Sequence, residues 1–183
     1  MSLQAVSEFL RMIQIIRFSE MNPNLHSALL GQLRRLYKEA SPSLRWSIDD
    51  HRERVRTNAD GYHLAMDGGQ VVGASYTLRT CAIPTDEELN RAATTTSAAL
   101  QHPDGTIFYF DLLLVHPDRQ GKGVDELLIR KQLEDARESG FREVHFIGQP
   151  HLRAYYGRRI GARRTGAHCV VNGVQYDRWI KQI

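Results

Sequence analysis

The stretch IFYFDLLLVHPDRQGKGVDELLIRKQLEDA, residues 107–136, decides the fold of this chain. It opens with an apolar run over 107–115, which predicts a strand, and passes through a turn into a loop that contains Gly121 and Gly123. Apolar residues then recur at helical spacing from Val124 onward. A strand that leads through a glycine-rich loop into a helix often binds phosphate, because the first amides of the helix have no internal partner and point at the anion. The stretch therefore predicts an anion-binding loop.

Length and composition limit the class of protein. A chain of 183 residues with 42% apolar and 25% charged residues has the size and balance of an ordinary globular domain. We expect residues 13–183 to form a single domain, preceded by an extension or tail over 1–12. No apolar run approaches the roughly 20 residues that a membrane-spanning helix needs.

Cysteine usage and charge bear on location and partners. Residues 1–17 lack the basic start and long apolar block of a secretory signal, and Cys81 and Cys169 have no metal-type spacing. We therefore expect a cytoplasmic protein without a metal site. A net charge of +3 permits anionic ligands but is too small to indicate nucleic acid. Neither nucleic acid nor a membrane is expected as a partner, and a homodimer is left open.

Turn and cap signals divide the chain into strands and helices. The Asp-Gly-Gly run at 67–69 and the Asn-Gly pair at 172–173 favour tight hairpin turns. Ser47 and Thr85 each stand three residues before a carboxylate, which is the spacing of a helix N-cap. The expected strands are 13–18, 62–66, 71–78, 107–115, 143–147, 167–171 and 174–180, and the expected helices are 23–38, 47–58, 124–136 and 149–159. This order predicts an α/β (α+β) fold with a mixed, mostly antiparallel sheet of about seven strands and helices on both faces.

Residues 79–105 interrupt this alternation. They begin with a capped helix start and continue through a segment rich in Ala and Thr. One interpretation is a solvated surface insertion. The other is a lid that covers the substrate, since long connections in compact domains are often binding elements.

The run VHPDRQGKGV at 115–124 resembles motif A of the GNAT superfamily of N-acetyltransferases, in which V-x-P precedes R/Q-G-x-G-x-G/A and an amphipathic helix. The expected order of elements agrees with that family from residue 13 to the C-terminus. The motif, its strand and its helix together are more specific than a lone Gly-x-Gly. The resemblance implies a GNAT-like fold and acetyl-coenzyme A (acetyl-CoA) as cosubstrate.

The glycine loop suits the diphosphate of that cosubstrate. Gly121 and Gly123 let backbone amides approach a diphosphate without an intervening side chain, and Lys122 adds positive charge. The resemblance also implies that the end of the preceding strand offers backbone groups to the pantetheine arm. The expected cofactor-binding residues are Leu113, Leu114, Val115, Gln120, Gly121, Lys122, Gly123 and Val124.

One position departs from the family pattern. Where the family has a small residue, Gly or Ala, this chain has Asp125. By helical spacing Asp125 falls within the apolar face of the expected helix. A carboxylate in the first turn is stabilised by the helix dipole, yet it would repel a diphosphate at the same amides.

The resemblance implies a tyrosine acid for the leaving thiolate, on the helix after the fifth strand and ahead of a glycine. Tyr156 ahead of Gly161 is the closer match here, and Tyr155 is its neighbour. Tyr156 stands five positions before Gly161, whereas the tyrosine of the family usually stands about four positions before its glycine. Tyr155 and Tyr156 lie about 100° apart on a helix, so only one faces the thioester. The alternative for Tyr156 is a packed core tyrosine.

Asp111 is the expected general base. By strand alternation it shares a face with Leu113 and Val115. A carboxylate in an apolar strand must meet water, a partner or a substrate ammonium, so a structural partnership is the alternative. Four histidines could carry protons by residue type, but none has a motif behind it: His63, His102, His116 and His151.

The segment that follows the fifth expected strand is basic. Its arginines either reach an anionic tail such as the terminal phosphate of the cosubstrate, or form a solvated surface. They are Arg153, Arg158, Arg159, Arg163 and Arg164.

Two functional hypotheses follow. The first is an N-acetyltransferase that moves an acetyl group from acetyl-CoA to the primary amine of a small molecule or protein, by direct attack in a ternary complex. The second is a catalytically divergent acyl-CoA-binding or partner-binding protein of the same fold, motivated by Asp125 and by the spacing of Tyr156 and Gly161.

Overall fold

The computed structural model describes residues 12–41 and 47–183. The expected N-terminal extension lies outside these residues, apart from Met12. Within them, no helix is both long and apolar enough to cross a membrane. The chain forms two compact units, of which the first comprises the described residues up to 76 and 112–131, and the second comprises 77–111 and 132–183.

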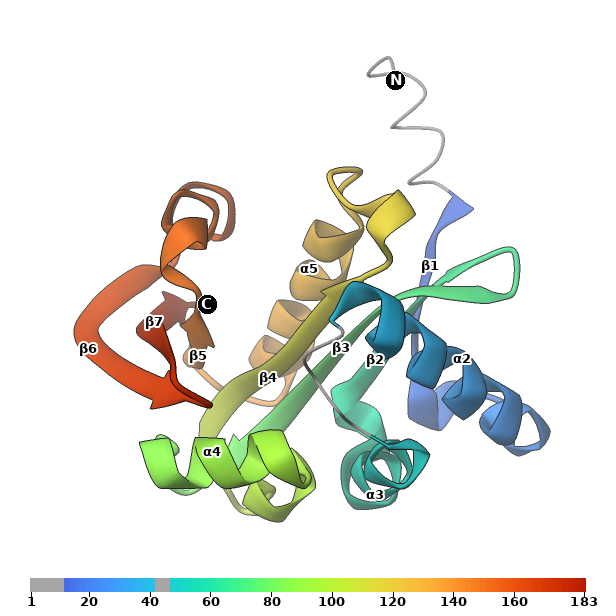
Figure 1. Cartoon of the computed structure of the whole chain (residues 1–183), viewed down its shortest axis with the longest axis horizontal. Coiled ribbons are helices and arrows are strands. Elements are labelled where there is room, and N and C mark those ends of the chain that lie inside the picture. Colours follow the sequence, from blue (N-terminus) through green and yellow to red (C-terminus); the bar gives the residue numbers. More distant parts are fainter. Residues whose placement is uncertain (1–11, 42–46) are drawn as a thin grey trace. The chain divides into compact units, whose positions relative to one another are not determined.

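The strands follow the expected order along the chain (Figure 1). They are β1 (Gln14–Arg17), β2 (Tyr62–Asp67), β3 (Gln70–Thr80), β4 (Ile107–Val115), β5 (Glu143–Gly148), β6 (Arg163–Val171) and β7 (Val174–Gln182). Hydrogen bonding orders them β1-β2-β3-β4-β5-β7-β6. β4 and β5 run parallel, whereas β1–β2, β2–β3, β5–β7 and β6–β7 are antiparallel. The predicted mixed, mostly antiparallel sheet is therefore confirmed.

The described α-helices are α2 (His26–Ala40), α3 (Ile48–Asn58), α4 (Asp86–Thr94) and α5 (Val124–Glu138). α3 and α4 begin where their cap signals place them, whereas α2 begins after a 3₁₀ turn over Pro23–Leu25. The expected helix 149–159 is instead a 3₁₀ turn over Pro150–Leu152 followed by a π-helix over Tyr155–Ile160. The Ser47 and Thr85 side chains each accept a hydrogen bond from the backbone amide three residues ahead, and the carboxylate there bonds back to the cap. Two otherwise unpaired amides are satisfied at each helix start, so the local sequence fixes both starts.

In the first unit, β2 is covered on both faces. The hydroxyl of Tyr62 lies 3.2 Å from that of Tyr37 on α2 and 3.0 Å from Nδ1 of His51 on α3. Ala65 points to the other face, where it packs in one cluster with Leu128 of α5. α2 and α3 therefore cover one face of β2, and the first turns of α5 cover the other (Figure 1).

In the second unit, two aromatic clusters line one face of the strands. Phe108 of β4 and Val144 of β5 are paired neighbours and pack with Ala136 of α5. Phe146 of β5 stacks on Trp179, its partner on β7, with ring centroids 6.2 Å apart. These rings form the floor on which the segment after β5 lies.

α4 closes the outer edge of β6. Asp86 accepts a hydrogen bond from the Val170 amide and pairs with Arg178 at 3.0 Å. Asn90 donates to the Val170 carbonyl and accepts from the Asn172 amide. Edge strands expose unpaired backbone groups, and here two side chains of α4 satisfy three of them. The segment 79–105 is thus anchored to the hairpin of β6 and β7.

The main difference from expectation lies in this hairpin. β6 begins at Arg163, four residues before the predicted start at 167. The register shifts between Arg164 and His168, and Gly166 has a φ of 88°. The early part of β6 is exposed and polar, so it shows no apolar alternation by which its sequence would indicate a strand.

Candidate active site

The glycine loop joins β4 to α5 in the first unit. After Val115 the chain makes a short 3₁₀ turn over Pro117–Arg119 and then reaches Gly121 and Gly123, whose φ angles are 69° and 85°. Residues with a Cβ rarely adopt these angles, so the loop requires glycine at both positions. A Cβ built on Gly121 would meet no atom within 4 Å, so this stretch of backbone is open to a ligand. The loop therefore fits the close approach of an anion to its amides.

Two side chains of the loop hold its own backbone. The Gln120 amide donates to the Val115 carbonyl at 3.1 Å, and Lys122 Nζ donates to the Asp118 carbonyl at 2.6 Å. Both expected cofactor-binding side chains thus help to shape the loop. Lys122 also keeps its charge within the loop, where it favours an anion.

One ion pair and one histidine–carboxylate contact tie the segment ahead of the glycines to the rest of the first unit. Arg119 donates to Asp67 at 3.0 Å, and His116 Nε2 lies 2.7 Å from Glu39 of α2. His116 Nδ1 accepts the backbone amide of Asp118, so Nε2 carries the hydrogen that Glu39 accepts. His116 is thus a cap and a tether for the turn, and both of its ring nitrogens are engaged.

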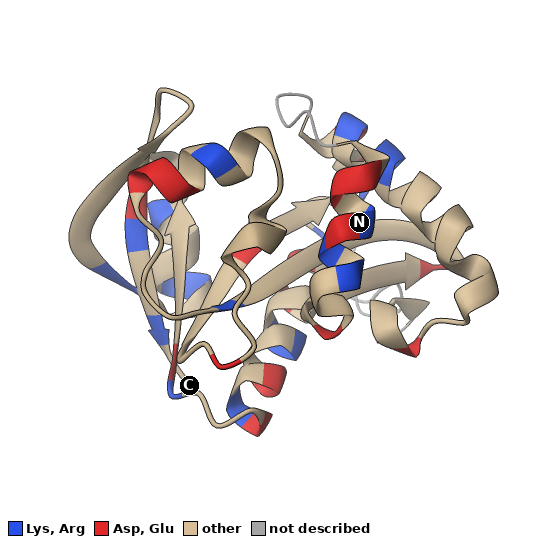
Figure 2. Ribbon diagram, turned by 90° about the horizontal axis from the view of Figure 1, so that it is seen from below, with Lys and Arg blue, Asp and Glu red and all other residues tan. Residues whose placement is uncertain are grey.

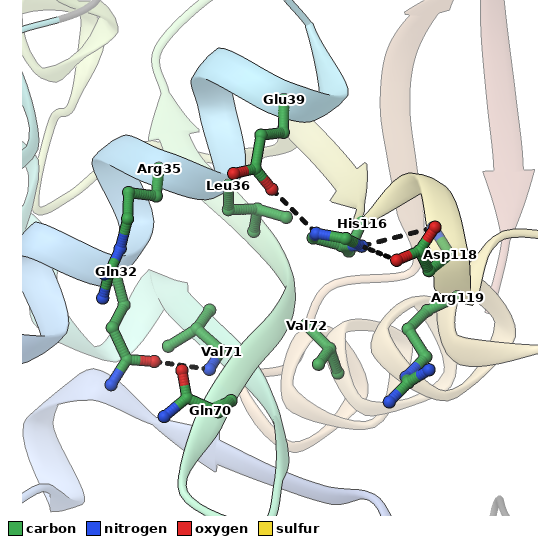
Figure 3. A pocket seen from close by; sticks show the side chains of 10 residues that line it. All are labelled: Gln32, Arg35, Leu36, Glu39, Gln70, Val71, Val72, His116, Asp118 and Arg119. Atoms are coloured by element: carbon green, nitrogen blue, oxygen red, sulfur yellow. Dashed lines mark hydrogen bonds and ion pairs between the residues drawn. The ribbon is translucent and has the colours of Figure 1, made fainter.

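These side chains line a cavity of about 340 Å³ (Figure 3). The wall on α2 carries Gln32, Arg35, Leu36 and Glu39, the start of β3 carries Gln70, Val71 and Val72, and the turn carries His116, Asp118 and Arg119. Gln32 accepts the Val71 amide at 2.7 Å and so fixes α2 to β3. The cavity is polar and lies beside the turn that leads into the glycine loop.

The strand end and the helix start pack tightly against each other. Val115, Val124 and Leu128 are buried in one cluster, with Leu113 against it. Gly73 on β3 lies at this contact, because a Cβ there would lie 3.1 Å from side chains of Val124 and Leu128. The apolar side chains of Leu113, Val115 and Val124 therefore belong to the core, so these residues could contact a ligand through their backbone and not through their side chains.

Asp125 lies in the first turn of α5, half-buried. Its neighbours Val124, Leu128 and Ile129 are buried, so Asp125 stands at the border of the buried face. Glu126 adds a second carboxylate to the same turn and is exposed. The first turn of α5 is therefore acidic, which favours the helix and opposes an anionic ligand.

In the second unit, Tyr156 lies at the end of β5. Its ring centroid lies 5.3 Å from those of Phe146 and Trp179. The ring rests directly on Gly148, where an added Cβ would lie 2.8 Å from both Cδ2 and Cζ. Burial raises the pKa of Tyr156, with a smaller opposing effect of the Gln149 backbone amide. Tyr156 is therefore protonated at neutral pH and able to donate.

A π-helix absorbs the long spacing between Tyr156 and Gly161. The segment Tyr155–Ile160 is a π-helix, and the Gly161 amide donates to the Tyr156 carbonyl five residues back. Gly161 ends it in the left-handed conformation, with φ 67°. π-turns hold one residue more than α-turns and are frequent at functional sites. The π-helix therefore accommodates the additional residue, and Tyr156 packs against Phe146 and Trp179.

Asp111 has a close partner in the segment 79–105. The Ser97 hydroxyl donates to Asp111 Oδ2 at 2.5 Å, and Ser97 belongs to the 3₁₀ turn Ser97–Leu100 after α4. Ser97 is buried and Asp111 half-buried. Asp111 thus has a structural partner, which is the alternative to its role as a base, and it is still partly exposed to solvent.

Sequence reasoning missed two features of the second unit. Gly148 accommodates the Tyr156 ring, and only its position at a strand end before a helix hints at this. Asp177 is fully buried and collects Arg153, Arg164 and His168 around it. These residues are distant in sequence, so no motif joins them.

The candidate residues divide between the two units. The expected cofactor-binding residues all lie in the first unit, and Asp111 and Tyr156 lie in the second. Among the residues described, no three His, Cys, Asp or Glu side chains are arranged to hold a metal ion.

Comparison with known proteins agrees with the architecture. A mixed sheet with a glycine loop at the start of α5 is the framework of a CoA-dependent acyltransferase fold. The model of the acetyltransferase (GNAT) family matches residues 30–162, well over half of the chain. The chain therefore belongs to the GNAT acetyltransferase family. A search of curated protein sequences found no match.

Solved structures share the fold at low sequence identity. A GNAT-like decarboxylase, GphF, in complex with isobutyryl-CoA is 24% identical, covers 93% of this chain and 98% of its own, and has a TM-score of 0.67. The loading GNATL domain of CurA from Lyngbya majuscula is 14% identical over 93% of this chain and 97% of its own, with a TM-score of 0.72. The NatC complex bound to Gag peptide and CoA is 14% identical over 93% and 98%, with a TM-score of 0.65. At these identities the likeness shows the fold alone.

Proposed function

We propose that the chain is a cytoplasmic N-acetyltransferase that moves an acetyl group from acetyl-CoA to a primary amine of a small molecule or protein. The observation that carries this proposal is the glycine loop, with open backbone at Gly121 and positive φ at Gly121 and Gly123. The membership of the GNAT family supports it. Residues 13–183, including both units, act in this proposal as one acetyltransferase domain.

The reaction is a direct transfer in a ternary complex. Amides around Gly121 and Gly123 hold the diphosphate, Lys122 adds charge, and the backbone of Leu113, Leu114 and Val115 holds the pantetheine arm. The neutral amine attacks the thioester carbonyl, and the carbon–sulfur bond breaks. Tyr156 donates its phenolic proton to the leaving thiolate, and Asp111 takes the proton lost by the amine nitrogen.

The surroundings of Tyr156 and Asp111 support their proposed roles in proton transfer. Burial raises the pKa of Tyr156, which keeps its proton available at neutral pH. Asp111 is held by the Ser97 hydroxyl, which orients one of its carboxylate oxygens. Residues 79–105, which carry Ser97, act as a lid in this proposal and contribute to acceptor choice.

A second candidate is acyl-CoA binding without amine acetylation. It is favoured by Asp125, a carboxylate in the first turn of α5. GphF, named as a GNAT-like decarboxylase in complex with isobutyryl-CoA, is an example of this fold with a different acyl-CoA chemistry.

Thiol release from acetyl-CoA in the presence of a panel of amines tests the first candidate, together with thermal stabilisation by acetyl-CoA alone. Amine-dependent thiol release is the expected result. Stabilisation without turnover would support acyl-CoA binding instead. If neither occurs, the assignment of the glycine loop to CoA is wrong.

A further inference from the structure

A buried carboxylate organises a group of basic side chains on the second unit. Asp177 on β7 has no exposed side-chain surface, yet its two oxygens face solvent-reaching donors. Arg153 bonds it through Nε at 2.5 Å and through a terminal nitrogen at 3.0 Å. A terminal nitrogen of Arg164 lies 3.4 Å away, and His168 Nδ1 lies 3.0 Å away. We call these four residues the Asp177 cluster.

The Asp177 cluster holds more positive charge than Asp177 neutralises. Two guanidiniums face one carboxylate, which leaves a net positive charge even with His168 neutral. The Arg153 hydrogen bonds, opposed by burial, hold the pKa of Asp177 below its usual range, so the carboxylate stays charged. Full compensation of the two guanidiniums would need a second acid, and among the described residues no acid other than Asp177 is paired with Arg153 or Arg164.

The cations also retain unused hydrogen-bond donors. A guanidinium has five N–H groups, of which Asp177 takes two from Arg153 as hydrogen bonds, while Arg164 is held by an ion pair at 3.4 Å. The side chains of Arg153, Arg164 and His168 are 45%, 39% and 41% exposed. Asp177 therefore fixes their inner edges while their outer edges face solvent, which reduces the entropy cost of binding an anion there.

The Asp177 cluster lies beside Tyr156. Asp177 is the cross-strand partner of Gly148, on which the Tyr156 ring rests. Trp179, two residues along β7, shares the face of Asp177 and packs against Tyr156. Arg164 is in turn the cross-strand partner of Trp179 on β6. The cations and the candidate acid thus occupy one face of the same strands.

We propose that the Asp177 cluster is a binding site for an anionic oxygen group, a carboxylate or a phosphate, carried by a ligand that reaches Tyr156. Arg153 and Arg164 receive the anion through their outer N–H groups, in the forked geometry that guanidinium offers to such groups. Asp177 is a positioning residue. The anion belongs either to the acceptor amine or to the 3′-phosphate of CoA, and this assignment of ligands rests on the proposed function.

Charge is unevenly placed in this unit. Figure 2 marks the acidic residues at the start of α4, where Asp86, Glu87 and Glu88 occupy the first turn. One of them, Asp86, pairs with Arg178, which alternates to the face opposite Asp177. Asp86 therefore compensates Arg178 on the other face, and no ion pair among the described residues joins the acidic turn to the Asp177 cluster.

The first test measures binding of inorganic phosphate to the full chain by thermal shift, at constant ionic strength set with chloride. Arg164→Gln should raise the apparent Kd for phosphate about tenfold, because one of two forked contacts is lost. Arg163→Gln is the matched control: it removes the same charge from the neighbouring exposed residue, which does not contact Asp177. Arg164→Lys should restore little, since an ammonium lacks the fork.

Arg164 is a better test position than Asp177 because Arg164 is partly exposed. When Arg164 is replaced, Asp177 still has Arg153 as a partner. Equal phosphate affinity in Arg164→Gln and Arg163→Gln would overturn the proposal, as would the absence of phosphate binding to the unmodified chain. Both outcomes are read without catalysis, so they are independent of the proposed function.

Two further arms identify the source of the anion. Affinity for CoA is compared with affinity for its 3′-dephospho form, in the unmodified chain and in Arg164→Gln. If the unmodified chain binds CoA more tightly than its 3′-dephospho form and Arg164→Gln does not, the Asp177 cluster binds the 3′-phosphate of CoA. In the second arm, KM is compared between the unmodified chain and Arg164→Gln. The two substrates are an amine that carries a carboxylate and the same amine without it. A rise in KM confined to the carboxylated amine assigns the cluster to the acceptor, and no change in either arm would exclude both sources.

Discussion

The ring of Tyr156 lies against the backbone of Gly148 with no space for a side chain between them, since an added Cβ would lie 2.8 Å from Cδ2 and Cζ. Gly148 ends β5, and Tyr156 follows in the π-helix. The φ of Gly148 is not positive, so the close approach of the ring is the reason for glycine here. The position of the candidate acid therefore depends on a residue that performs no chemistry.

Gly148→Ala should displace the Tyr156 ring and lower kcat by about tenfold to a hundredfold, because small displacements of a catalytic group are costly. The Kd for acetyl-CoA, measured by calorimetry, should change little, since Gly148 lies outside the glycine loop. Gly157→Ala is the matched control in the same helix, because a Cβ there meets nothing within 4 Å. Full turnover in Gly148→Ala would show that the ring position is unimportant.

Tyr156→Phe should lower kcat by about a hundredfold or more, the usual contribution of a general acid, and leave the Kd for acetyl-CoA unchanged. The acid acts in its protonated form, so activity is lost as pH rises through its pKa. Because burial raises that pKa above the ordinary value of 10.0, kcat should stay level on the alkaline side up to about pH 10. A fall in kcat near pH 8 that disappears in Tyr156→Phe would contradict this environment.

Asp125→Gly should tighten acetyl-CoA binding about two- to fivefold, the effect of removing one like charge from the start of α5. Asp125→Asn separates charge from size and should give most of the same gain. Glu126→Gln removes the exposed carboxylate of the same turn and serves as the comparison. Unchanged or weaker affinity by calorimetry in Asp125→Gly would contradict the repulsion of the diphosphate.

His51 should make the protein less stable in mild acid. Burial, assisted by the charge of Arg54, lowers the pKa of His51 to about 4, whereas the unfolded imidazole titrates near 6.5. As pH falls between these values the unfolded chain takes up a proton that the folded chain does not. Up to roughly 3 kcal/mol of unfolding free energy should be lost across this window, and none above it.

Urea unfolding from pH 7.5 to pH 4.5 measures that loss. His51→Gln is less stable overall because it disturbs the contact with Tyr62, but its unfolding free energy should depend less on pH in the same window. An identical pH dependence in the variant and the unmodified chain would assign the effect to other groups.

Much of the fold follows from short-range sequence signals. Ser47 and Thr85 start α3 and α4 through bonds within one turn, and the Asn172–Gly173 pair adopts φ angles of 50° and 75°, which make a tight hairpin. The glycine loop was also predictable, because the backbone angles that it needs are those that glycine allows. Because the loop resembles the GNAT motif, the sequence predicted a family as well as an anion-binding loop. The family model confirms that family.

The sequence by itself therefore determined the elements, the loop and the family, since each depends on interactions between residues a few positions apart. Only the tertiary structure decided the order β5-β7-β6, the early start of β6 and the fit of Tyr156 on Gly148. It alone brought Arg153, Arg164 and His168 to Asp177, because strand pairing joins residues that have no fixed spacing along the chain. Packing likewise decides which carboxylate is buried and charged, and a sequence pattern cannot report burial that arises from distant segments.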